Sequence, residues 1–469
     1  MDKKNAKIYI HNTNQALRWI EKKMNILTLI RTRYEHLKNS KLSCESLRIK
    51  NSQKFRNLVK FIDRHSPYYR KIIKDYDIDP GTCSPEHFPV LSKQQVMENF
   101  DEIVTDKSVT YDKIESFIRT SNNPLNLFKD KYYVLHTSGS SGKPGYFVYS
   151  KDDFSRGMAH GMRLVSFKLR GRRTRIAFLG TANGHFAGVT MVSMSKRSVS
   201  RLLFKTGIFE INRPIDSLLH DLNEFNPDIL IGYATMLIIL AEKKKEGLLR
   251  ISPSIIESCG EPLFSTNKNI LENTFKCAVL NVYAVTEHIY MGISKPEYNG
   301  MYLLEDDLIF ELHEDHICIT NLFNFTMPLI RYRMDDVLVP IEDLDKKLPF
   351  IKIREVIARS EFTPIFKNKY GDDDFISPFV FDPFSVNNLR AFQIKLIDKQ
   401  SFIFKALPQS GLSDSQKHEM HEVIKSKLSR ILSEKCMDNV TFEIQELEDL
   451  PINPITRKAA LIVPPEGTY

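Results

Sequence analysis

Cysteines are few in this sequence, and none is arranged as a metal or redox site. The six are scattered between Cys44 and Cys436, with no CxxC pair and no clear set of histidines at ligand spacing. Reduced thiols are therefore expected rather than disulfides or a metal site. The basic N-terminus leads into no apolar core of a signal peptide, so we expect none and a cytoplasmic protein.

Long apolar runs and nucleic-acid signatures are missing as well. The most apolar run, residues 229–241, falls short of the ~20 residues that a membrane span requires and contains Tyr233 and Thr235. It predicts a buried strand that enters a helix. The net charge is +8, but the basic residues are spread out and no zinc, RNP-type or basic-helix signature accompanies them. We expect this charge to attract anionic small molecules, not nucleic acid.

The 469 residues, of which 42% are apolar, suffice for two or three packed domains. Apolar residues at helical spacing predict an amphipathic helix over residues 52–64, broken before Pro67. Residues 1–50 predict a helical extension with an apolar stripe that ends at Leu27, packed on the protein rather than on a membrane or partner. Strand–turn–helix alternation over residues 176–283 predicts an α/β protein with ligand loops at the carboxyl ends of its strands.

One loop concentrates groups that bind phosphate. It lies between two apolar runs, residues 132–136 and 146–149, and reads Thr-Ser-Gly-Ser-Ser-Gly-Lys-Pro-Gly. Its glycines let backbone N–H groups point at an anion, and its hydroxyls and lysine add donors. The spacing is not that of a Walker A loop, and a flexible surface turn is the alternative. The candidate phosphate-binding residues are Thr137, Ser138, Gly139, Ser140, Ser141, Gly142 and Lys143.

Two segments farther on contain candidate carboxylates. Glu287, in Tyr283-Ala-Val-Thr-Glu, follows an apolar run, and a single carboxylate beside a triphosphate suffices for Mg²⁺. Thr and Glu also begin many helices as capping residues, which is the alternative. Asp336 ends the charged run 331–336, where it would accept hydrogen bonds from ribose hydroxyls unless the run is a solvated turn.

A histidine between glycines is a further candidate. His185 lies in Asn-Gly-His-Phe-Ala-Gly, between a predicted strand and a predicted helix. It either lines a pocket or packs as a structural histidine. The segment 226–235, by contrast, predicts a turn, a strand and a helix start that support the fold without a catalytic role.

These segments, in this order, resemble the adenylate-forming ligases, the superfamily of acyl-CoA synthetases and adenylation domains. The sequence is most similar to the phenylacetate–CoA ligase-like branch, through the loop, Ser-Pro-Tyr-Tyr-Arg at residues 66–70 and Phe-Pro-Val-Leu-Ser-Lys at residues 88–93. The resemblance spans roughly residues 55–460. It implies an N-terminal extension (1–50), a large α/β domain that binds ATP and the acyl group (51–357), a hinge (358–363) and a small, mobile α+β C-terminal domain (364–469).

The resemblance also implies roles for individual residues. ATP and Mg²⁺ would be bound in the large domain, and Lys458 would enter from the small domain during adenylation. Ala284, Asp335, Ala358 and Arg457 depart from the family pattern. The implied set is Tyr283, Gly260, Glu261 and Pro262 beside the adenine, Thr286 on the α-phosphate, Asp336 on the ribose, Arg359 on the ribose or the α-phosphate, His185, Phe186 and Gly188 at the acyl pocket, Glu287 on the metal, Glu361 at the hinge and Lys458 as the catalytic cation.

The implied reaction has two steps. A carboxylic acid, with an aryl acid as the family default, attacks ATP to give an acyl-adenylate and pyrophosphate, and a thiol, by default that of coenzyme A, then displaces AMP. A carrier protein, an amine or a cofactor as acceptor stays open. A catalytically degenerate nucleotide-binding scaffold and a basic nucleic-acid-binding protein are the alternatives from other classes, and a homodimer is left open.

Overall fold

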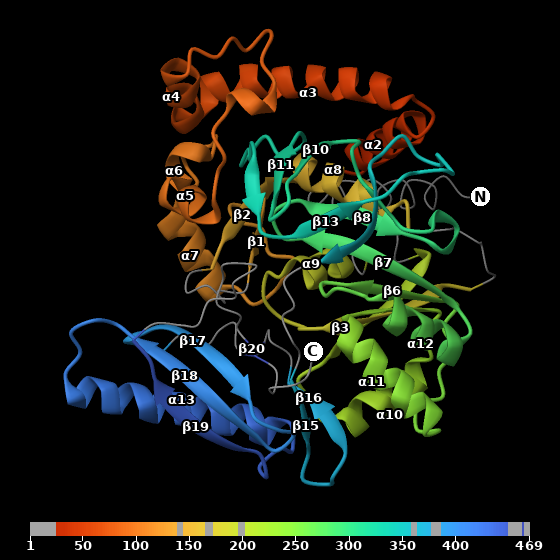
Figure 1. Ribbon diagram of the computed structural model, residues 1–469, viewed down its shortest axis with the longest axis vertical. Coiled ribbons are helices and arrows are strands. Elements are labelled where there is room, and N and C mark those ends of the chain that lie inside the picture. Colours follow the sequence, from red (N-terminus) through yellow and green to blue (C-terminus); the bar gives the residue numbers. More distant parts are fainter. Residues whose placement is uncertain are drawn as a thin grey trace, which may run out of the picture.

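The structure of the protein is a computed structural model that describes residues 25–137, 144–164, 172–195, 202–357, 364–376, 386–448 and 462–463. Figure 1 shows α3 and α4 at one end of the molecule and the small C-terminal domain at the other. Among the described residues, no helix combines the length and the apolar character needed to cross a membrane.

The predicted amphipathic helix is confirmed and is longer than expected. Its apolar positions Phe55, Leu58, Val59 and Ile62 are buried, and it ends before Pro67, the first residue of the next helix. It also runs through residue 50, where the sequence places the end of an extension. The exposed Leu27 does not join a packed stripe. The N-terminal helices are α2 (Ile26–Asn39), α3 (Cys44–His65), α4 (Pro67–Asp75), α5 (Lys93–Glu98), α6 (Phe100–Ile103) and α7 (Tyr111–Thr120).

A nine-stranded sheet forms the centre of the large domain. Its strand order is β13-β14-β9-β8-β7-β6-β5-β3-β4, and β4, β3, β5, β6 and β7 are parallel. Their carboxyl ends therefore meet at one edge, as the alternation of strands and helices predicts. The strands are β3 (Thr174–Gly180), β4 (Phe204–Glu210), β5 (Ile229–Gly232), β6 (Ile255–Cys259), β7 (Ala278–Val285), β8 (Ile289–Ser294), β9 (Met301–Leu303), β13 (Val337–Pro340) and β14 (Lys352–Ile357).

Alternate residues of the parallel strands face opposite layers. Leu230, Ile256 and Val279 are buried in a core with α10 (Ile215–Phe225), α11 (Ala234–Lys245) and α12 (Ser265–Phe275). The opposite face meets α8 (Lys151–Gly161) and α9 (Ala187–Ser195). Beside this sheet lie the hairpin of β1 (Tyr132–His136) and β2 (Tyr146–Ser150) and the three-stranded sheet of β10 (Leu308–Leu312), β11 (Ile317–Asn321) and β12 (Tyr332–Met334).

The C-terminal domain has its own core, built around Phe404, Ile424 and Leu428. Lys435, almost fully buried, joins it to the large domain: its Nζ donates to the carbonyls of Ile211 and Arg213. It also pairs with Asp374 at 2.9 Å. The elements are β15 (Ile365–Lys367), β16 (Asp373–Phe375), β17 (Leu389–Leu396), β18 (Ser401–Pro408), α13 (Asp414–Glu434), β19 (Thr441–Glu446) and β20 (Ile462–Val463).

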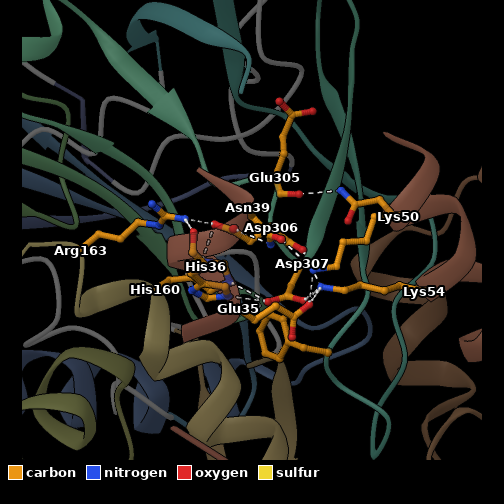
Figure 2. Close-up of polar contacts among 12 residues, drawn as sticks. Glu35, His36, Asn39, Lys50, Lys54, His160, Arg163, Glu305, Asp306 and Asp307 are labelled. Carbon is orange, nitrogen blue, oxygen red and sulfur yellow. Dashed lines mark hydrogen bonds and ion pairs between the residues drawn. The ribbon is translucent and has the colours of Figure 1, made fainter. Parts of the chain in front are cut away.

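A buried polar cluster attaches α2 and α3 to the large domain, as Figure 2 shows. Asp307, before β10, pairs with His36 of α2 at 2.8 Å and Lys54 of α3 at 2.7 Å. A buried carboxylate destabilises the folded protein unless it is paired with a cation or a hydrogen-bond donor. These contacts therefore fix where α2 and α3 pack on the large domain. We call this the anchor cluster; its members are Glu35, His36, Asn39, Lys54, His160, Arg163, Asp306 and Asp307.

Candidate active site

A cavity of about 400 Å³ lies at the carboxyl ends of β3, β5, β6 and β7. Loops at this edge supply much of its polar lining, while the strands and α9 supply most of its apolar lining. Most of the described candidates from the sequence meet here: Thr137, Phe186, Gly188, Gly260, Glu261, Pro262, Tyr283, Thr286, Glu287 and Asp336. Ser138, Gly139, Ser140, Ser141, Gly142, Lys143, Arg359, Glu361 and Lys458 lie outside the described residues.

The β1–β2 hairpin holds the start of the candidate phosphate loop. Thr137 and Gly145 close its base, since the Thr137 N–H donates to the Gly145 carbonyl and the Gly145 N–H donates to Thr137 Oγ1, both at 2.9 Å. Lys93 Nζ donates to the same Oγ1 at 3.1 Å. A Cβ on residue 145 would lie 2.8 Å from Lys93 Cε, so glycine leaves room for this lysine. Lys93 thus brings a cation to the base of the loop.

Thr286 and Glu287 occupy the turn between β7 and β8. The alternative that they cap a helix is therefore wrong. The Tyr149 hydroxyl donates to the Thr286 carbonyl at 2.8 Å, and the Tyr332 hydroxyl donates to Glu287 Oε1 at 3.2 Å. Both hydrogen bonds hold the turn against the cavity, where the Glu287 carboxylate forms part of the lining.

Asp336 lies against Tyr283, whose hydroxyl donates to Asp336 Oδ2 at 2.5 Å. The aspartate is buried and lines the cavity. Arg331, in the same charged run, forms an ion pair with Glu311 at 2.7 Å. The run is therefore not a solvated turn, and it places one carboxylate beside the cavity.

The Gly-Glu-Pro segment after β6 borders the cavity and supports the neighbouring helix. Glu261 Oε2 accepts a hydrogen bond from the Thr235 N–H at 2.8 Å, in the first turn of α11. Gly260 has φ of +78°, and a Cβ there would approach the Tyr233 ring to 2.7 Å. Tyr233 itself lines the cavity, so the segment 226–235 contributes to the site as well as to the fold.

His185 is not part of the cavity lining. Its ring is buried, with Nε2 3.0 Å from Ser121 Oγ and the ring centroid 5.0 Å from that of Phe117. The structural interpretation of this histidine therefore fits better than the pocket role. His136, at the end of β1, lines the cavity instead, and its ring centroid lies 4.3 Å from that of Phe186. Burial lowers the pKa of His136 to about 4, so the ring is neutral at pH 7.

The inner part of the cavity is mostly apolar, with Ile229, Ile231 and Ile255 on its sheet face. Glu257 and Tyr290 also line it. The sequence interpretation assigned neither residue to the site. An acidic residue that continues an apolar strand just before Gly-Glu-Pro was the available signal.

Three groups of side chains outside the cavity bring metal-ligand atoms within 4.8 Å of one another, one of them His220, Asp221 and Glu224 of α10. Another is His313, His316 and Cys318, which corrects the expectation that no cysteine has histidine partners. The third, in the anchor cluster, is His36, His160 and Asp306. In the anchor cluster Arg163 pairs with Asp306, and Lys54 with Asp307, so the carboxylates are already neutralised.

No protein-family model and no curated protein sequence matches this chain. Solved structures do match it. A 2-hydroxyisobutyryl-CoA ligase in complex with 2-HIB-AMP and CoA in the thioesterification state superposes with a TM-score of 0.60 at 15% identity, over 91% of both chains. This chain has the adenylate-forming ligase fold. The same ligase with 2-HIB-AMP in the postadenylation state gives a TM-score of 0.53 at 14% identity, over 89% of both chains. The candidate residues therefore lie in an adenylate-forming ligase fold, at the loop edge of its parallel strands.

Proposed function

We propose that this protein activates a carboxylic acid with ATP, forming an acyl-adenylate and pyrophosphate, and then transfers the acyl group to the thiol of coenzyme A. The observation that carries the proposal is one cavity bordered by the phosphate-loop base, the Thr286–Glu287 turn and Asp336. We further propose the phenylacetate–CoA ligase-like branch, on the sequence motifs described above. The similar ligase named above was solved with an acyl-AMP and CoA, which supports both steps.

In this proposal the nucleotide lies along the polar edge of the cavity. Asp336, held by Tyr283, accepts hydrogen bonds from the ribose hydroxyls. Thr286 donates its hydroxyl to the α-phosphate, and Lys93 adds positive charge beside Thr137, where the β- and γ-phosphates would lie. These groups are fixed by neighbouring side chains before ATP binds, which favours electrostatic stabilisation of the developing charge.

Glu287 is the residue proposed to hold Mg²⁺. Its carboxylate lines the cavity, and an oxygen donor of this kind is what this hard cation takes besides phosphate oxygens and water. Mg²⁺ bound there would neutralise phosphate charge. Three further roles are proposed on the family resemblance alone: Arg359 on the ribose or the α-phosphate, Glu361 at the hinge, and Lys458 as the cation that enters during adenylation.

ATP–pyrophosphate exchange with a panel of carboxylic acids tests the first step. Wild-type protein with Mg²⁺ should exchange label with one class of acid. Glu287→Gln should lower the rate by at least about 100-fold, as expected for loss of an electrostatic group at the reacting phosphates. Glu242→Gln, on the exposed face of α11, is the matched control and should leave the rate unchanged.

Two results would contradict the proposal. One is full exchange activity in Glu287→Gln. The other is silence across a broad panel of acids by a protein that binds ATP, which would favour the degenerate scaffold. Formation of acyl-CoA, followed by mass spectrometry after addition of coenzyme A, tests the acceptor separately.

A further inference from the structure

The inner wall of the cavity contains a carboxylate in apolar surroundings. In β6 the residues Ile255, Glu257 and Cys259 alternate onto the cavity face, while Ile256 points to the helices on the other side. The strand register places Glu257 opposite Ile231 of β5 and Leu280 of β7, both of which also line the cavity. Glu257 thus interrupts a surface that is otherwise shaped for an apolar group.

Glu257 has no hydrogen bond or ion pair with any described residue. No lysine or arginine among the described residues lines the cavity either. Tyr290 of β8, on the same cavity, likewise has no hydrogen-bond partner for its hydroxyl in the described part of the chain. The two groups are close enough for the Glu257 charge to act on the tyrosine. The Glu257 carboxylate and the Tyr290 hydroxyl can therefore both form hydrogen bonds with a molecule in the cavity.

An unpaired carboxylate in such a wall is costly for the protein alone. Removing a carboxylate from water without a partner costs several kcal/mol unless it takes up a proton. Burial accordingly raises the pKa of Glu257 to about 7. A hydrophobic residue would fill the same wall without this cost. The residue is explained if a bound molecule supplies the missing donor.

The position of Glu257 says which part of that molecule it contacts. It lies two residues before the end of β6, about 6–7 Å from the strand end at ~3.3 Å per residue. The nucleotide edge, with Thr286 and Glu287, lies beyond the strand ends. An acid with its carboxylate at that edge would point its far end toward Glu257.

We propose that the acid substrate carries a hydrogen-bond donor, an ammonium, amine or hydroxyl group, at the end remote from its carboxylate, and that the Glu257 carboxylate accepts from it. This inference rests on the proposed function for the identity of the site. Tyr290 supports the same group by donating to it or by accepting from it. A carboxylic acid without such a substituent would leave the Glu257 charge desolvated and unpaired, which the site penalises.

The test compares pairs of acids that differ only in the donor. Wild-type protein would be assayed with 4-aminobenzoate, 4-hydroxybenzoate and 4-methylbenzoate, and with matching ω-amino, ω-hydroxy and unsubstituted aliphatic acids. We expect kcat/KM in ATP–pyrophosphate exchange to be about 10- to 100-fold higher with the donor-bearing member. At pH 7 the aliphatic ω-amino acids present a cationic donor, whereas 4-aminobenzoate and the hydroxy acids present neutral donors, so the arms distinguish the two kinds of donor.

Variants of Glu257 then test whether this side chain causes the preference for donor-bearing acids. Glu257→Leu should abolish it or favour the methyl compound, and Glu257→Gln, which keeps the shape of the side chain, should reduce it. Glu242→Gln is the surface control. A wild-type preference for the methyl compounds, or discrimination that is unchanged in both Glu257 variants, would overturn the proposal.

A binding measurement separates this inference from the proposed function. Saturation-transfer NMR with the same acid pairs and no ATP reports whether donor-bearing acids bind better to wild type than to Glu257→Gln. Selective binding without any exchange would retain the substrate inference and reject the adenylation reaction. Exchange with acids whose binding shows no such selectivity would retain the adenylation reaction and reject the substrate inference.

Discussion

Replacing Glu257 with glutamine should stabilise the ligand-free protein, and the gain should grow with pH. Burial raises the pKa of this carboxyl from 4.5 to about 7 in the folded state. Between pH 4.5 and about pH 7, Glu257 keeps its proton in the folded protein but has released it in the unfolded chain. Stability therefore falls as the pH rises through this window, and below pH 4.5 the contribution vanishes. Glutamine does not titrate and removes this dependence.

The magnitude follows from the same two pKa values. Each tenfold change in proton affinity corresponds to 1.36 kcal/mol, so the full effect above pH 7 is at most about 3 kcal/mol. Solvent that enters the cavity reduces the desolvation of Glu257 and so lowers this free energy. His136, whose pKa burial lowers to about 4, also changes stability with pH, but it is present in both proteins and cancels in the comparison. Burial raises the pKa values of Cys259 and Tyr290, which moves their titration away from this pH range.

Differential scanning fluorimetry of both proteins at pH 5 and pH 8 would measure the effect. The melting-temperature advantage of Glu257→Gln should be about 2–3 °C larger at pH 8. The surface variant Glu242→Gln should track wild type at both pH values. An advantage that is the same at both, or a variant less stable than wild type at pH 8, would refute the idea that Glu257 is desolvated and unpaired.

Three further predictions concern other contacts. Tyr283→Phe removes the hydrogen bond to Asp336 and should raise KM for ATP about tenfold in the exchange assay with little change in kcat; an unchanged KM would contradict a ribose role for the aspartate. Lys435→Met removes the two hydrogen bonds of this lysine to the large domain and should change the ratio of pyrophosphate exchange to acyl-CoA formation. Equal effects on both steps would argue against a role of Lys435 in domain orientation. Asp307→Asn leaves His36 and Lys54 without their shared carboxylate and should cost about 3–5 kcal/mol in denaturant unfolding, with a negligible loss contradicting the proposed importance of the anchor cluster.

Motifs and periodicity were enough to predict the α/β fold and the polar edge of the cavity. Phe55 and Ile62 could be placed in the core because a helix repeats every 3.6 residues, and Glu287 could be placed at a strand end because an apolar run precedes it. The fold itself is confirmed by the solved ligase structures. These signals are local, and each lies within a few residues of the position that it predicts.

Contacts between distant segments could not be predicted in this way. Lys93 reaches Thr137 across 44 positions, and nothing in either segment indicates the other. His136 lines the cavity and His185 does not, because only the packed structure decides which ring faces the cavity. Glu257 was missed for a different reason: only the register of β6 with β5 and β7 shows that this side chain faces the ligand side of the sheet.

The anchor cluster has a consequence for how the chain is made. His36 and its partner Asp307 are separated by 271 positions, so a ribosome that adds about 5–20 residues per second takes roughly 15–55 s to supply the second after the first. During that interval α2 and α3 lack Asp307, the carboxylate that His36 and Lys54 share in the folded protein. The first described helices of the polypeptide are thus among the last to reach their final position, and a nascent chain stalled before residue 306 should present them to chaperones and proteases.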